Sequence, residues 1–258
     1  RLANLKPDLL VVAAYGQILS DALLQVARLG GVNLHASLLP EYRGAAPINW
    51  AIYHGETITG VSVIQMTPRV DAGAILLQAE TPIGPEETAG ELETRLAELG
   101  APLVCQAIDG LAAGTLTGRT QDRSQATRAP KLTKEHGQID WSRAAVAICN
   151  QIRAMQPWPM AYTFLHRADG STPERIIVER AFASHVQSPP DLANTPGSLF
   201  AVDPLESSGG SLLVACAGRD AVAIQQLRPA GKRSMSAAEF LRGNRPQPGD
   251  RFGPATFS

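Results

Sequence analysis

Apolar residues follow two different patterns along the chain, continuous runs near its start and alternating runs further on. Residues 9–14 form a continuous apolar run, which is typical of a strand buried on both faces. A helical pattern over 20–29 follows, and 31–36 have the composition of a second short strand. Strand, helix and strand joined by short connections predict a parallel α/β sheet.

The sequence from residue 47 to about residue 111 predicts two more strands and two helices. The pattern favours a helix over 47–54, an edge or antiparallel strand over 60–66, and its partner over 74–80. Thr88 and Glu91 have the spacing of a capping box, and leucines at helical spacing continue to about residue 111. This segment has the clearest helical signal in the chain.

The polar stretch 114–137 has no apolar periodicity, so we interpret it as a connection between two domains. After it, Ser142 is a candidate N-cap for a helix over 144–155, and a short helix is predicted over 236–242. Turn residues separate short strands at intervals suited to a small closed barrel, over 162–166, 175–183, 197–202, 211–215 and 221–227. We therefore predict a first domain over 1–117, a linker over 118–136 and a barrel over 137–258.

The composition excludes some classes of protein but does not indicate a function. The chain has 258 residues, 44% hydrophobic and 18% charged, with a net charge of -1, which is ordinary for a globular protein. A small basic excess in the second half permits contact with RNA without requiring it. No apolar run is long enough for a membrane span and no signal peptide begins the sequence, so we expect a cytoplasmic protein with no membrane partner.

Cysteines and the start of the chain give two further expectations. Cys105, Cys149 and Cys216 fit no metal or redox spacing, which predicts buried free thiols. A buried strand so close to Arg1 needs neighbours on each side, so we expect earlier βα units that this sequence lacks.

Asn33 and His35 are the first candidates for chemistry. Alternate residues of a strand project from the same face, so both side chains can address one small group. An amide donor beside an imidazole suits an oxygen that gains negative charge as a carbonyl becomes tetrahedral. Asp71, in a polar loop between two predicted strands, could hold the imidazole protonated. By themselves these residues also fit a hydrogen-bonded strand end and an ordinary turn.

Several motifs together resemble a known family. Residues 33–49, NLHASLLPEYRGAAPIN, and 63–76, VIQMTPRVDAGAIL, are similar to the core of formyltransferases that use 10-formyltetrahydrofolate. Asn33, His35 and Asp71 match the catalytic triple of that family. Residues 131–141, 152–161 and 227–241 resemble the linker and C-terminal domain of those members that act on methionyl-tRNA. The resemblance implies a Rossmann-like domain, incomplete at its N-terminus, followed by an OB-like β-barrel that binds tRNA.

The resemblance also implies a reaction and its partners. The α-amine of methionyl initiator tRNA would attack the formyl carbon of 10-formyltetrahydrofolate, with Asn33 and His35 stabilising the oxyanion and Asp71 holding His35 charged. No metal is implied, and we expect a monomer. The loop over 14–19, the SLLP segment and the Asp71 loop would bind folate, through Gln17, Ile18, Leu19, Ser37, Leu38, Leu39, Pro40 and Val70. Candidates for contact with tRNA phosphates, which could equally be solvated surface charges, are Arg43, Arg228, Lys232 and Arg233.

Some alternatives stay open at this stage. Trp141, Trp158 and Phe164 fit a barrel core better than a platform for stacking bases. Formyltransferases or hydrolases that act on an amino-sugar nucleotide or another small amine share the triple, although the barrel motifs favour tRNA. A non-catalytic protein that binds RNA or folate is a further alternative, which the intact triple disfavours.

Overall fold

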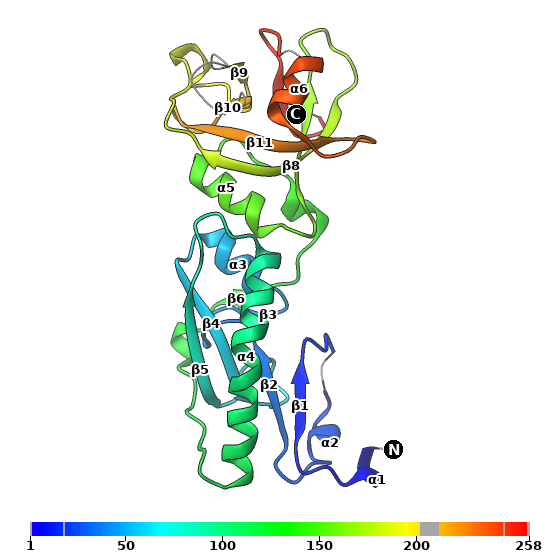
Figure 1. Cartoon of the computed structure of the whole chain (residues 1–258), viewed down its shortest axis with the longest axis vertical. Coiled ribbons are helices and arrows are strands. Elements are labelled where there is room, and N and C mark those ends of the chain that lie inside the picture. The colour runs from blue at the N-terminus through cyan, green and yellow to red at the C-terminus, as the bar shows by residue number, and fades with distance from the viewer. Residues whose placement is uncertain (1, 18, 202–211, 245, 257–258) are drawn as a thin grey trace. The chain divides into compact units, whose positions relative to one another are not determined.

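The computed structural model describes residues 2–17, 19–201, 212–244 and 246–256. The chain divides into two compact units (Figure 1). The first contains residues 1–52 and 56–132, and the second contains 53–55 and 133–258. No helix in the described ranges is long and apolar enough to cross a membrane.

A four-stranded sheet with the order β1-β2-β4-β5 forms the centre of the first unit (Figure 1). Its strands are β1 (Leu10–Ala13), β2 (Gly31–His35), β4 (Ile58–Gln65) and β5 (Ile75–Pro82). The predicted parallel pairing of the first two strands is confirmed, and β4 and β5 add to β2 in antiparallel order. Of the two alternatives predicted for 60–66, an edge strand or an antiparallel strand, the second is confirmed: β4 lies inside the sheet, pairs antiparallel with both neighbours and has six of its eight residues buried.

β1 differs from the prediction of a strand buried on both faces. Its residues alternate between half-buried and exposed, and Val11 is 49% exposed. Among the described strands β1 pairs with β2 alone, so it lies at an edge of this sheet.

Four α-helices lie among the described residues of the first 112: α1 (Leu2–Leu5), α2 (Asp21–Leu24), α3 (Pro47–His54) and α4 (Ala89–Ala112). The capping box of α4 is present as predicted, with Thr88 and Glu91 each bonded to the other's backbone. Ser20 caps α2, but this helix ends five residues earlier than predicted. After it the backbone leaves the α-helical pattern, since the N–H of Val26 donates to the Leu23 carbonyl three residues back and the N–H of Leu29 donates to the Asp8 carbonyl.

α4 covers one face of the sheet. Val32 packs with Ala107 of this helix, and Gly100 approaches Leu34 so closely that a Cβ atom would lie 2.5 Å from its side chain. Since side chains alternate along a strand, Asn33 and His35 project from the face that α4 does not cover. This arrangement leaves the two polar residues directed away from the apolar layer.

The stretch after α4 packs on the first unit. The pair β3 (Arg43–Gly44) and β6 (Arg128–Ala129) forms a short parallel sheet, and Ala129 and Leu132 are buried. Two 3₁₀ helices lie in this region, at Arg123–Gln125 and Lys134–Gly137. Residues up to 132 of the predicted linker 118–136 are therefore part of the first unit, because its backbone and small apolar side chains have partners there.

The second unit is a nearly closed antiparallel barrel with the strand order β13-β7-β8-β11-β10-β9 (Figure 1). A bridge between Ser198 and Arg251 joins its two end strands. The strands are β7 (Ala161–His166), β8 (Glu174–Ala183), β9 (Leu199–Ala201), β10 (Leu212–Ala215), β11 (Ala221–Pro229), β12 (Met235–Ser236) and β13 (Arg251–Gly253). The predicted ends of the third and fourth strands, at 202 and 211, lie outside the described residues.

Two helices accompany the barrel, α5 (Ala145–Ala154) and α6 (Ala237–Gly243). Both were predicted, but Ser142 is not the N-cap of α5. Ala144 occupies that position, because the Ser142 hydroxyl donates to Asp140 instead. A short helix was predicted over 236–242, and Ser236 caps α6 in a capping box with Glu239.

Two aromatic residues, Trp158 and Phe164, and two cysteines, Cys105 and Cys149, depart from the predictions. Phe164 is half-buried rather than in the barrel core, because it alternates along β7 with residues that face inward. Cys149 is likewise half-buried. Trp141 is buried and stacks on Phe252, with ring centroids 5.7 Å apart. The core prediction is wrong for Trp158, which is 49% exposed because it follows α5 and precedes β7, outside the barrel's inward-facing positions. Cys105 is also exposed, on the outer side of α4, whereas burial raises the pKa of the Cys216 thiol to about 12.

Candidate active site

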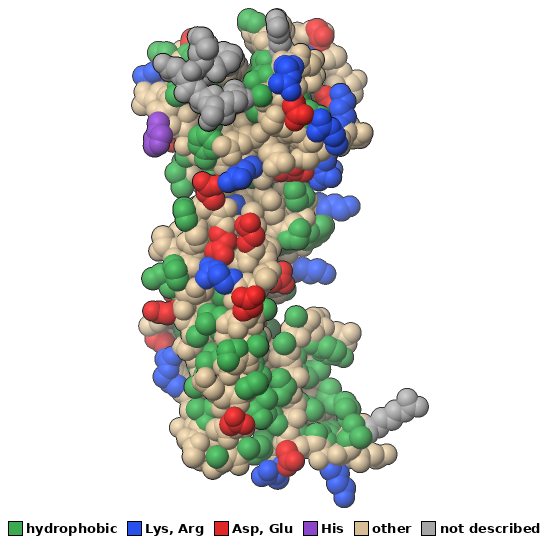
Figure 2. All heavy atoms as spheres, viewed as in Figure 1, with side chains coloured by type: hydrophobic (Ala, Val, Ile, Leu, Met, Phe, Trp, Pro, Cys, Tyr) green, Lys and Arg blue, Asp and Glu red, His purple; other side chains and the backbone are tan. Residues whose placement is uncertain are grey.

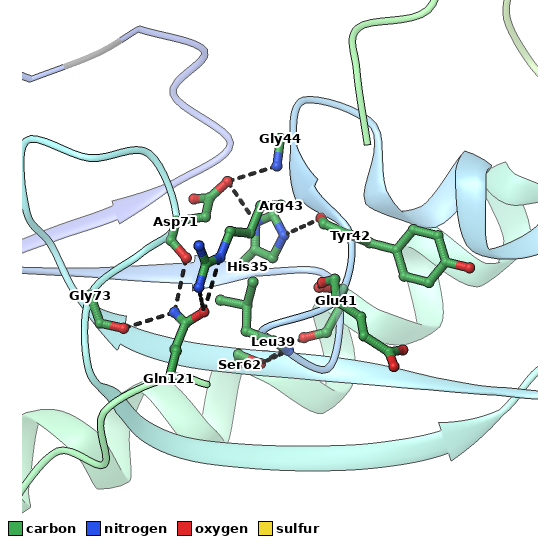
Figure 3. A network of polar contacts seen from close by, with 11 residues as sticks. His35, Leu39, Glu41, Tyr42, Arg43, Gly44, Ser62, Asp71, Gly73 and Gln121 are labelled. Carbon is green, nitrogen blue, oxygen red and sulfur yellow. Dashed lines mark hydrogen bonds and ion pairs between the residues drawn. The ribbon is translucent and has the colours of Figure 1, made fainter. Parts of the chain in front are cut away.

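His35 ends β2 and is buried, with 5% of its surface exposed. Its Nε2 lies 2.9 Å from the carbonyl oxygen of Tyr42, so Nε2–H donates and the carbonyl accepts (Figure 3). Its Nδ1 lies 3.6 Å from Oδ2 of Asp71. One ring nitrogen therefore faces a backbone carbonyl and the other faces a carboxylate.

Asn33 lies two residues before His35 on the same face of β2. It is half-buried, and its side-chain amide has no hydrogen-bond partner among the described residues. An amide in this state can donate to a bound group without first breaking a bond within the protein.

Asp71 reaches His35 because the loop between β4 and β5 folds back along the sheet. The loop starts at the far end of β2, where the N–H of Met66 donates to the Gly31 carbonyl. Asp71 has a φ of +50°, a left-handed conformation that Asp tolerates better than most residues. Its carboxylate accepts from the N–H of Gly44 at 3.0 Å.

The segment Tyr42–Gly44 holds both members of the His35–Asp71 pair. Its first residue supplies the carbonyl that binds the imidazole, and its last supplies the N–H that binds the carboxylate. Gly44 has a φ of +129°, and a Cβ atom there would lie 2.4 Å from the carbonyl oxygen of Ala129. The position therefore requires glycine for two separate reasons.

Tyr42 is itself fixed at both ends. Its backbone has a φ of +58° and its N–H donates to the hydroxyl of Thr127 at 2.8 Å. Its own hydroxyl donates to Glu56 at 2.6 Å, and burial together with that acidic partner raises the pKa of Tyr42. Its carbonyl is thus held in place to receive His35.

The SLLP segment is more internally bonded than a simple pocket wall would require. The hydroxyl of Ser37 donates to the Glu41 carbonyl, and Leu39 donates its N–H to Ser62 and accepts from Gln78. Leu39 also packs in the core, whereas Leu38 and Pro40 are half-buried. The Leu39–Pro40 peptide bond is cis.

The other predicted folate residues lie in two loops. Parallel pairing aligns Ala13 with Leu34, so the loop after β1 starts beside the His35 end of β2. In that loop Gln17 is exposed and Leu19 is half-buried, and Ile18 lies outside the described residues. Val70, next to Asp71, is 52% exposed.

The predicted phosphate contacts belong to different units. Arg43 is in the first unit and directs its guanidinium onto Oε1 of Gln121, with distances of 3.1 and 2.6 Å. In the second unit Arg228 pairs with Glu179, Arg233 pairs with Glu239, and Lys232 is exposed. Figure 2 shows Lys and Arg side chains gathered near α6 with acidic side chains among them.

Three residues of this site were not predicted from the sequence. Tyr42 and Gly44 act through backbone groups, which side-chain patterns do not reveal. Gln121 lies in a polar stretch with no distinguishing signal. Within the described ranges no group of three or more His, Cys, Asp or Glu side chains is placed to hold a metal ion.

Comparison with known proteins identifies the class of protein to which this chain belongs. Residues 1–108 match the formyl transferase family model, and residues 131–245 match the model of the formyl transferase C-terminal domain. Among solved structures, HypX from Aquifex aeolicus in complex with tetrahydrofolic acid aligns with a TM-score of 0.64 at 19% identity, covering 93% of this chain and 39% of that one. The sugar 3N-formyl transferase WlaRD aligns at 0.63 and 16% identity, covering 90% and 77%. Both show the same fold.

Relatives with higher sequence identity identify the family more narrowly. Methionyl-tRNA formyltransferase from Geobacter sulfurreducens is 42% identical over 98% of this chain and 74% of its own length. The enzyme of the same name from Pseudomonas fluorescens is 43% identical over 95% of this chain and 71% of its own length. The chain belongs to the methionyl-tRNA formyltransferase family and spans about three quarters of the length of these relatives.

Proposed function

We propose that this chain transfers the formyl group of 10-formyltetrahydrofolate to the α-amine of methionine carried by initiator tRNA, in the cytoplasm, as part of translation initiation. The relatives' shared name and the match along both units support this choice. The observation that carries it is the placement of Asp71 beside His35, whose strand face also presents the amide of Asn33, a group without a hydrogen-bond partner among the residues that the structure describes.

The donor supplies an activated formyl carbonyl, and the residues of this chain act on its oxygen and on protons. The Asn33 amide and the protonated imidazole of His35 donate to the oxygen as it becomes negatively charged. His35 then gives a proton to the departing nitrogen. Asp71, held by Gly44 N–H, keeps the imidazole charged and accepts a proton from the attacking amine through water. No covalent intermediate with the protein is needed.

Folate binding is proposed for the exposed loop groups rather than for bonded ones. Gln17, Leu19 and Val70 are at least partly accessible, whereas the polar groups of Ser37 and Leu39 already have partners in the protein. Leu38 and Pro40 then contribute apolar surface. The SLLP segment supports the pocket mainly by fixing its shape.

Formyl transfer by the purified chain tests this function. The chain should formylate methionyl initiator tRNA and leave an amino-sugar nucleotide unmodified. His35→Ala should lower kcat by about 10²- to 10⁴-fold, as expected for loss of a general acid. His166→Ala is the matched control, because it removes a similar bond from an imidazole Nε2 to a backbone carbonyl in the second unit. Activity on the sugar alone, or an active His35→Ala variant, would contradict the proposal.

Arg228, Lys232 and Arg233 are proposed to bind phosphates of the tRNA, since all three side chains reach solvent on the second unit. Replacing Lys232 by Ala should weaken tRNA binding and reduce the dependence of log Kd on log salt by about one unit at most. Binding measured from low to high salt checks this. An unchanged slope would assign Lys232 to solvated surface charge.

A further inference from the structure

Two sets of contacts hold Asp71, one at its carboxylate and the other at its backbone. The left-handed backbone at this residue is less stable than the common conformations, so neighbouring contacts must maintain it. The Gly44 N–H fixes one carboxylate oxygen. The backbone of the loop is fixed separately, by a side chain from a distant part of the chain.

Gln121 provides that second contact. It is buried, with 5% of its surface exposed, and its Nε2 donates to the carbonyl of Asp71 at 2.9 Å and to the carbonyl of Gly73 at 2.8 Å (Figure 3). The loop is tightly placed at this point, because a Cβ atom at Gly73 would lie 1.7 Å from the Gln65 carbonyl oxygen. One amide therefore fixes the backbone on both sides of Ala72.

Arg43 fixes the orientation of this amide. Its guanidinium donates twice to Oε1 of Gln121, so both donors and both acceptor positions of the amide are used. Turning the amide over would place its oxygen against two carbonyls and its NH₂ group against a cation. Only the observed orientation is favourable, and it is the one that holds the Asp71 loop.

Gln121 lies outside both regions that match the family models, which cover 1–108 and 131–245. The segment that carries it is attached to the sheet on either side. Arg119 exchanges two backbone hydrogen bonds with Ile75, and Thr127 binds the backbone of Tyr42 and Arg43. This segment, residues 119–130, thus contacts the Asp71 loop and the segment that holds His35.

We propose that Gln121 is a positioning residue for catalysis, which acts with Arg43 to hold Asp71 at the distance from His35 that the reaction requires. The kinetic part of this proposal rests on the proposed formyl transfer. A merely structural glutamine would contribute to stability alone, whereas a positioning residue affects kcat through Asp71 and leaves substrate binding largely intact.

Two substitutions separate the contacts of Gln121. Gln121→Met keeps the length of the side chain and removes every hydrogen bond. Gln121→Glu keeps an acceptor for Arg43 and removes both donors to the loop. Gln151→Met is the matched control, because Gln151 is also buried and its Nε2 also bridges two backbone carbonyls, those of His136 and Gln138 in the second unit.

Both Gln121 variants should lower kcat by about 10- to 100-fold with KM for either substrate changed less than about threefold. Gln151→Met should lose stability and keep kcat. In an Asp71→Ala background, Gln121→Met should have no further effect on kcat, because the group that it positions is gone. Wild-type kcat in both Gln121 variants, or additive losses with Asp71→Ala, would overturn the proposal.

Hydrogen exchange gives a readout that does not depend on activity. Peptides covering residues 66–74 should exchange faster in both Gln121 variants than in the wild type and unchanged in Gln151→Met. If the wild-type chain fails to formylate methionyl-tRNA, the proposed function fails and the exchange result still decides whether Gln121 holds the loop. Unchanged exchange in both Gln121 variants would show that it does not.

Discussion

At the scale of single residues, the site depends on backbone groups as much as on side chains. His35 and Asp71 provide the titratable atoms, and the Tyr42 carbonyl and Gly44 N–H fix their positions. Both of these backbone groups come from residues with positive φ. The sharp turn of the segment is thus the means by which one short stretch binds an imidazole and a carboxylate at once.

The substitution Gly44→Ala tests whether the turn at Tyr42–Gly44 positions His35 and Asp71. The substitution adds a Cβ atom 2.4 Å from the Ala129 carbonyl at a φ of +129°, so we expect a loss of about 2–4 kcal/mol in the free energy of unfolding together with loss of activity. Gly114→Ala is the control, because Gly114 also has a positive φ, +69°, but nothing lies within 4 Å of the added atom. It should cost about 1 kcal/mol and keep activity. Chemical denaturation and kinetics check both, and equal effects would contradict the argument.

The sequence reveals some of these residues and conceals others for physical reasons. Asn33 and His35 stand out because two polar residues at strand spacing are unusual in an apolar run, and Asp71 because it lies in a loop between strands. Gln121 does not, because a buried polar residue in a polar stretch looks the same as a solvated one. The catalytic role of Gln121, like the roles of Asn33, His35 and Asp71, stays a prediction.

At the scale of helices and strands, local signals predict well those elements that local interactions stabilise. α4 begins at a capping box and carries an apolar face throughout its length, so its bounds follow closely from sequence. β3 and β6 are two-residue strands whose existence depends on pairing between distant segments, and α2 is a single turn. The two short strands have too little periodicity to be recognised before the tertiary contacts are known, and for the single-turn helix α2 the pattern predicted the start but not the end.

Thr88→Ala should destabilise α4 by about 0.5–2 kcal/mol, because the Thr88 hydroxyl accepts from the N–H of Glu91 at the first turn. Thr94 offers the control within the same helix. Its hydroxyl donates to the Gly90 carbonyl on an exposed turn, so Thr94→Ala should be neutral or slightly stabilising. Thermal unfolding of both variants gives the comparison. A larger loss from Thr94→Ala would show that the cap contributes little.

At the scale of the whole molecule, each unit has its own hydrophobic core. The barrel encloses one cluster of buried residues from Ile139 to Phe252, and the first unit has separate clusters around Val32 and around Leu39. The barrel, which is nearly closed, was predictable from the regular spacing of strands and turns. The attachment of residues 119–130 to the first unit was not, because it depends on backbone bonds to Ile75 and Tyr42.

Asp250 is the buried charge on which the second unit should depend for its response to pH. Its side chain is 1% exposed and pairs with Arg167 at 2.8 Å. Burial alone would raise the pKa of Asp250, but N–H groups of Gln247 and Ala168 and the Arg167 guanidinium together lower it. A lowered pKa in the folded state means that the stabilisation is complete above the unfolded value of about 4 and is lost as pH falls below it.

Asp250→Asn should therefore lower the stability of the second unit at pH 7 by about 1–3 kcal/mol and reduce its further loss of stability between pH 5 and pH 2. Since the units have separate cores, we expect calorimetry to resolve two transitions, of which Asp250→Asn shifts one and Gly44→Ala the other. Glu239→Gln is the control: the Arg233 side chain lowers the pKa of Glu239 to about 2, but the Glu239 side chain is 34% exposed against 1% for Asp250, so solvent screens its charge. A single transition that both Asp250→Asn and Gly44→Ala shift would show that the two cores unfold together.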